Sequence, residues 1–219
     1  MSPDDFPAFF SDVPPLHLHD PLAELLGAVP QGCPIEYGFV DAVKAAGHVC
    51  PTVAGGWLVT AAALAALYAG GELPVRGEIA VRAMGAPDQF GYGPMAQVIG
   101  HLTGAAGETG FRGLGGRFCR AGLLTFRPET PALATFELER TDTHAAVRAT
   151  YLPERVPLDP GMRPAMSAAL AGDPEAGAVF RRLWLDRVRR ILEAATQVVE
   201  LGPAAASPLA SPGERREAE

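Results

Sequence analysis

One stretch of this chain leaves few options for its fold. No charged side chain, His48 aside, lies between Lys44 and Glu72. Within it, residues 53–69 read VAGGWLVTAAALAALYA, an alanine-rich segment without a polar face. A helix that is apolar all round in a soluble protein lies at the centre of its core. The stretch therefore predicts a buried helix around which the remaining elements are arranged.

The residues in front of this helix combine a helix start with a thiol and an imidazole. Pro51 suits the first helical position, since its missing N–H would have no partner there, and Cys50 becomes the predicted N-cap. A thiol at that position faces the positive end of the helix dipole, which favours the thiolate that attacks electrophiles and binds metals. With His48 nearby, the pair suits zinc, copper or iron. The alternative is a small, inert, buried thiol.

Composition excludes several classes of protein. A net charge of −7 over 219 residues provides no overall attraction for nucleic acid. The three cysteines form no CxxC pair, which argues against a disulfide framework and fits a cytoplasmic protein. The uncharged stretch contains Gly55, Gly56, Thr60 and many alanines, so we read it as a core helix rather than a membrane span. We expect no partnership with nucleic acid or membrane.

Local start and stop signals divide the chain into four parts. Asp20-Pro21 starts a short helix, Gly47 ends another, and Asp173-Pro174 starts the clearest amphipathic helix. The predicted parts are a loose N-terminus at 1–15, a core domain at 16–172, an amphipathic helix at 173–200, and a disordered tail at 201–219.

Strand-like patterns alternate with these helices. Residues 75–84 alternate in hydrophobicity, and a helix is expected at 94–103. Three further strand candidates, 122–127, 133–140 and 144–152, are separated by short turns, which predicts antiparallel pairing. We therefore expect an α+β fold, with an antiparallel sheet around the buried helix and the amphipathic C-terminal helix packed outside.

Several motifs occur in an order that resembles a known family. Gly47-His48-Val49-Cys50-Pro51 precedes the Ala-rich helix, and then follow a strand, Gly85-Ala86-Pro87-Asp88, Gly-rich turns and Leu123-Leu124-Thr125-Phe126. Over residues 35–128 this resembles the FmdE-like family, named after one of the components of formylmethanofuran dehydrogenase. The chain would be a divergent branch without the zinc-ribbon. The resemblance implies an α+β homodimer that binds metal.

The resemblance also implies a set of site residues. It places His48 and Cys50 at the metal and matches Asp88 to an acidic position after the first strand. A mononuclear zinc site takes three or four protein ligands, and His19 is a further candidate because it lies on an extended segment next to Asp20. With zinc or iron bound, Cys50 and Asp88 are the candidate catalytic residues, Asp88 acting as a base toward a small molecule.

Two other functions remain open from the residues alone. Cys50-Pro51 and Cys33-Pro34 are Cys-Pro pairs, and a cysteinate can ligate haem iron in a binding or sensing module. Alternatively, Cys50 acts as a metal-free nucleophile with His48 as its partner. Whether the chain is an enzyme stays open. Trp184 and Leu185 widen the apolar face of the terminal helix, which predicts a homodimer.

Overall fold

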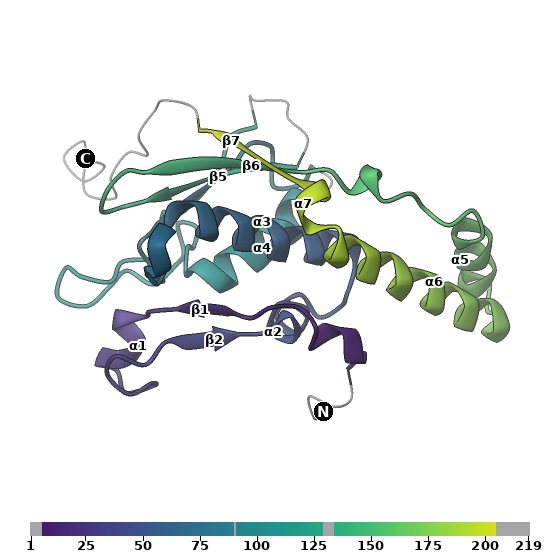
Figure 1. The fold of residues 1–219 in the computed structure, drawn as a ribbon, viewed down its shortest axis with the longest axis horizontal. Helices are drawn as coiled ribbons and strands as arrows, with labels where there is room; N and C mark the ends of the chain where they lie inside the picture. Colours follow the sequence, from purple (N-terminus) through teal and green to yellow (C-terminus); the bar gives the residue numbers. More distant parts are fainter. Residues whose placement is uncertain (1–5, 90, 129–133, 205–219) are drawn as a thin grey trace.

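A computed structural model describes residues 6–89, 91–128 and 134–204 (Figure 1). Its elements follow one another in this order: η2 (Ala8–Phe10), β1 (Leu16–Leu18), α1 (Pro21–Leu25), β2 (Ile35–Tyr37), α2 (Phe39–Ala46), α3 (Pro51–Leu67), η3 (Ala69–Gly71), β3 (Ile79–Ala83), α4 (Tyr92–Thr103), β4 (Leu124–Phe126), β5 (Thr135–Arg140), β6 (Ala146–Tyr151), η4 (Pro153–Arg155), α5 (Met162–Leu170), α6 (Pro174–Glu193), α7 (Ala195–Val198) and β7 (Val199–Pro203). The protein is α+β, as the sequence predicts.

The main sheet has five strands in the order β4-β3-β5-β6-β7. β5 pairs antiparallel with β3 and β6, and β7 pairs antiparallel with β6. The prediction of antiparallel pairing is wrong for β4, which lies beside β3 and runs parallel to it. The reason is topological. The chain leaves β3, passes through α4 and returns to the same edge of the sheet, and such a crossover produces a parallel pair.

The buried helix predicted at 53–69 is α3. Figure 1 shows α3 and α4 between strands β5–β7 on one side and β1, β2 and α2 on the other. Two glycines allow this close packing. A Cβ on Gly55 would lie 2.4 Å from the Tyr151 ring, and one on Gly56 would lie 2.9 Å from the Val98 side chain. The core therefore forms around α3 from elements on both of its sides.

The N-terminal segment differs from the predicted loose region at 1–15. Of this range the structure describes residues 6–15, which include the short helix η2. Phe10 is only 2% exposed, and its ring meets Phe39 edge-on at 5.1 Å. The buried Phe10 ring holds this segment against α2. The prediction of a loose segment came from its prolines and acidic residues, and these do not indicate such a contact.

The C-terminal region contains more structure than the sequence predicts. The amphipathic helix is α6, and its residues Val188 and Ile191 are fully buried, so it belongs to the same core as α3. Helix α5 and strand β7 were not predicted from the sequence. β7 includes residues 201–203 of the predicted tail, and residues 205–219 lie outside the described part of the chain. In Figure 1, α5 and the first half of α6 form an arm that extends beyond the sheet.

Candidate functional site

The start of α3 has the geometry that the sequence predicts. Cys50 is the N-cap in an extended conformation, and Pro51 occupies the first turn. The Cys50 Sγ accepts a hydrogen bond from the Val53 N–H at 3.4 Å. The side chain is nearly buried, at 8% exposed. The thiol thus contributes to the cap of the central helix and lies at its positive end.

The other predicted ligands do not converge on Cys50. His48 is exposed, and its Nδ1 lies 3.0 Å from the Ala46 carbonyl oxygen. Asp88 is exposed on the connection between β3 and α4. That connection passes the first turn of α3, since a Cβ on Gly91 would lie 3.9 Å from the Thr52 side chain.

His19 lies at the opposite end of α3 from Cys50. Its N–H donates to the Pro74 carbonyl at 2.9 Å, in the segment that follows α3, and its ring lies 3.1 Å from the Glu24 carboxylate. A helix of 17 residues spans roughly 25 Å. His19 and Cys50 therefore cannot ligate one metal ion within one chain.

The donor set does not fit the mononuclear metal site that the resemblance implies. Within residues 6–89, 91–128 and 134–204, no three His, Cys, Asp or Glu side chains are grouped so that they could hold a metal ion. A zinc site needs at least three protein ligands. Cys33, the second cysteine of the haem hypothesis, is exposed on the connection between α1 and β2.

The structure places different residues around Cys50, all from distant parts of the chain. The Tyr151 hydroxyl, at the end of β6, donates to the Pro51 carbonyl at 2.6 Å. The Trp184 indole N–H, from α6, donates to the Val49 carbonyl at 2.8 Å. Burial raises the pKa of Tyr151 well above its usual value, so its hydroxyl remains a donor. Arg187 approaches the same tyrosine from α6 and lowers that pKa in part.

A groove of about 290 Å³ lies on another side of α6, where the N-terminal segment crosses α3. Its floor is α3, and its walls are the segment before β1 and the last turns of α6 with the start of α7. Apolar side chains predominate in the lining, which consists of Phe9, Asp12, Val13, Pro14, Pro15, Leu16, Trp57, Leu58, Ala61, Arg189, Leu192, Glu193 and Ala195. The sequence predicts none of this set as a site.

The charged residues among the described lining of this groove are exposed. Arg189 forms ion pairs with Glu193 at 2.9 Å and with Asp186 at 2.7 Å, all on α6. Asp12 lies on the opposite wall and is exposed. At the floor, Trp57 is 1% exposed and Leu58 is 6% exposed. The groove thus has an apolar floor and a polar mouth.

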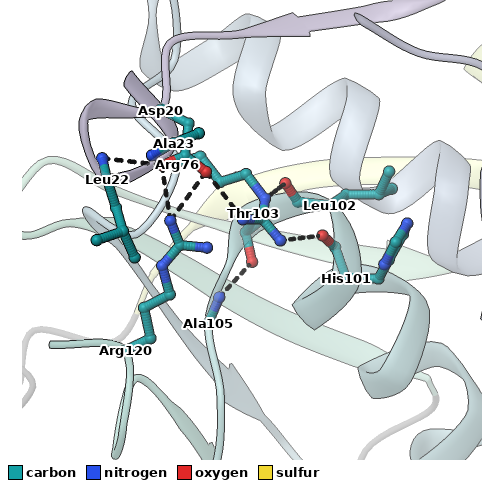
Figure 2. A network of polar contacts seen from close by, with 9 residues as sticks. All are labelled: Asp20, Leu22, Ala23, Arg76, His101, Leu102, Thr103, Ala105 and Arg120. Carbon is teal, nitrogen blue, oxygen red and sulfur yellow. Dashed lines mark hydrogen bonds and ion pairs between the residues drawn. The ribbon is translucent and has the colours of Figure 1, made fainter. Parts of the chain in front are cut away.

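A buried polar cluster holds the far end of the molecule together (Figure 2). Asp20 is 2% exposed and accepts from Arg76 at 2.9 Å and from Arg120 at 2.8 Å. It also caps α1 by accepting from the Leu22 and Ala23 N–H groups. Burial acts to raise the pKa of Asp20, but the bonds from Arg120, the Ala23 N–H and Arg76 outweigh it and hold that pKa below its usual value.

The same cluster reaches the end of α4. Arg76 donates to the Leu102 carbonyl at 3.2 Å and to the His101 carbonyl at 2.8 Å, as Figure 2 shows. The Tyr37 ring meets the His101 ring edge-on at 5.4 Å. Burial, aided by the Arg76 charge, lowers the pKa of His101. The Asp20 carboxylate bonds to both arginines, and Arg76 bonds to backbone carbonyls of α4, which identifies the cluster as a structural link between the β1–β2 pair, α4 and the approach to β3.

Comparisons with known proteins assign no family. No family model matches this chain, and no curated protein sequence matches it. Among the described helices, none is both long and apolar enough to cross a bilayer.

Proposed function

We propose that this protein binds a small, largely apolar molecule in the groove between the N-terminal segment, α3 and α6. The observation that carries the proposal is the groove itself, with about 290 Å³ of space above an apolar floor formed by Trp57, Leu58 and Ala61. Sites for small molecules are concave, mostly apolar, and begin at about 300 Å³. The groove is just below this range, so its occupant has few atoms.

The distribution of charge favours an occupant with one polar end. The described residues of the floor are apolar, while Arg189, Glu193 and Asp12 are charged and exposed. The apolar part of a bound molecule would contact Trp57 and be shielded from water. A polar group of the same molecule would stay at the rim. A polar rim that orients the ligand is typical of such sites.

Titration with a neutral apolar fluorophore, N-phenyl-1-naphthylamine, tests the proposal. We expect saturable binding to the wild-type protein, which Ala61→Leu weakens by about tenfold or more because the added methyl groups fill the groove. Ala65→Leu is the matched control, since Ala65 is exposed on the same helix and does not line the groove. Equal binding by wild type and Ala61→Leu would refute the proposal.

The metal-binding function implied by the family resemblance stays a prediction. It needs a ligand besides His48 and Cys50, from a second copy of the chain or from residues outside the described ranges. Elemental analysis of the protein beside its Cys50→Ser variant tests it. Stoichiometric zinc or iron that is lost in the variant would support the prediction, and a wild-type protein with no bound metal would contradict it.

We also propose that the homodimer predicted from the sequence forms through the arm of α5 and α6. Apolar side chains are exposed on this arm. They include Leu170 at 82%, Val179 at 40% and Met166 at 38%. Few residues of α5 are buried, namely Met162 and Ala165. A short helical hairpin that projects from its domain is stabilised when a second copy covers its apolar side.

A further inference from the structure

Arg187 on α6 is a buried guanidinium that forms no ion pair with a carboxylate among the described residues. The residue is 8% exposed, and its Nη2 donates to the Pro153 carbonyl at 3.3 Å. Its Nε and Nη1 are buried and have no hydrogen-bond partner in the described part of the chain. Arginine stays protonated in proteins, so a full positive charge lies in the interior with two donor groups unused.

Other buried or part-buried arginines among the described residues have carboxylate partners. Carboxylates pair with Arg76, Arg82, Arg120 and Arg140. An unpaired charge in the interior is costly, because it loses its hydration and gains no counter-charge. The cost shows as a lowered pKa of the Arg187 guanidinium, which burial causes. An anion beside Arg187 would remove this cost.

The guanidinium lies where three elements meet. Tyr151, at the end of β6, interacts electrostatically with both Arg187 and Cys50 and is bonded to Pro51 in the first turn of α3. One turn before Arg187 on α6, Trp184 is bonded to Val49. The positive end of the α3 dipole therefore lies beside the same tyrosine as the guanidinium. Both features favour a negative charge at this place.

We propose that the junction of Arg187, Tyr151 and the start of α3 binds one small oxyanion, the carboxylate or phosphate group of a small molecule. Arg187 supplies two N–H groups in a fork that matches two oxygens. The α3 dipole adds a positive field, and the Cys50 thiol lies beside the anion. The site is separate from the groove, because neither Cys50, Tyr151 nor Arg187 lines it. Either proposal can therefore fail without the other.

Thermal unfolding in phosphate and in formate tests this site. We expect one of these anions, at matched ionic strength, to raise the Tm of the wild-type protein by about 5 °C at saturation. Arg187→Met removes the charge and keeps an apolar stem. We expect this variant to be as stable as the wild type without anion and to lose the anion-dependent rise.

Arg190→Met is the matched control on the same helix, since Arg190 is paired with Asp186 at 2.9 Å and faces solvent in part. It should keep the full anion response. A response to formate alone assigns a carboxylate, and a response to phosphate alone assigns a phosphate. A wild-type Tm that neither anion changes would overturn the proposal.

A second measurement needs no variant. Iodoacetamide modifies accessible thiols, and mass spectrometry separates the rates at Cys33, Cys50 and Cys119. An anion bound at Arg187 should slow modification of Cys50 by at least about threefold and leave Cys33, which is exposed, unaffected. Equal rates at Cys50 with and without phosphate or formate would overturn the proposal even if Arg187→Met fails to fold.

Discussion

At the scale of single residues, Asp20 shows how one carboxylate joins distant segments. It is the predicted N-cap of α1, and it also pairs with arginines that lie 56 and 100 positions away. The local role follows from Asp20-Pro21, since this pair is a common helix start. The long-range role does not, because nothing adjacent in the sequence relates Asp20 to Arg76 or Arg120.

Asp20→Asn should destabilise the protein by about 3–5 kcal/mol, because it removes a buried carboxylate and leaves two part-buried guanidinium groups without their counter-charge. Urea unfolding followed by circular dichroism measures the change. Asp186→Asn is the control, since this exposed carboxylate pairs with surface arginines and should change stability little. Similar effects of the two substitutions would contradict the structural role of the Asp20 cluster.

The lowered pKa of His101 determines the direction in which the stability of the protein changes with pH. Its pKa is lower in the folded protein than in the unfolded chain, so the unfolded state binds the proton more readily. Stability is therefore fully present above the unfolded pKa of about 6.5 and falls as the pH drops toward the folded value. Urea unfolding between pH 7.5 and pH 5 should show this loss in the wild type and less of it in His101→Gln. Equal slopes of the unfolding free energy against pH in the two proteins would contradict the assignment of this pH dependence to His101.

At the scale of elements, helix starts were the most predictable features. Asp20-Pro21, Cys50-Pro51 and Asp173-Pro174 each begin a helix where the sequence predicts one. These signals are local, since a capping side chain and its N–H partners lie within three residues. The sequence did not predict strands β1, β2 and β7. They are only three to five residues long, and such short strands depend on pairing with the strands beside them.

Gly55 tests the contact between α3 and β6. In an exposed helix position Gly→Ala stabilises by roughly 0.5–1 kcal/mol. At Gly55 the new Cβ would lie 2.4 Å from the Tyr151 ring, so Gly55→Ala should instead destabilise by about 1–3 kcal/mol. Gly177→Ala on α6 is the matched control, because its nearest contact is an ordinary 3.5 Å and the helical preference should prevail. Thermal unfolding of both variants should give shifts of opposite sign, and shifts of the same sign would contradict the packing of Tyr151 on α3.

At the scale of the whole molecule, the central helix was predictable and its surroundings were not. An uncharged, alanine-rich segment indicates burial from its own composition. The groups that meet at the ends of α3 come from segments that are distant in the sequence. Arg187 follows Cys50 by well over a hundred residues, and His19, expected near Cys50, lies beyond the far end of α3. Which segments converge depends on the crossover through α4 and on the return of α6, and neither leaves a local signal.

The dimer proposal makes a prediction at this scale. Leu170 is 82% exposed on the arm, and an aspartate there would place a charge in the proposed interface. We expect light scattering to give twice the chain mass for the wild type and the single mass for Leu170→Asp. Leu25→Asp is the control, since Leu25 is 62% exposed on α1, away from the arm. A wild-type protein with the mass of one chain would refute the proposed dimer.

The groove is the central claim, and Trp57 on its floor permits a direct measurement. Trp57 and Trp184 are the only tryptophans, so in Trp184→Phe the tryptophan emission comes from Trp57 alone. Titration of this variant with N-phenyl-1-naphthylamine should quench Trp57 emission saturably, because a probe in the groove accepts its excitation energy. Adding Ala61→Leu should shift this quenching to probe concentrations about tenfold higher or more. Trp57 emission that does not change, or that falls equally with and without Ala61→Leu, would contradict a binding site in this groove.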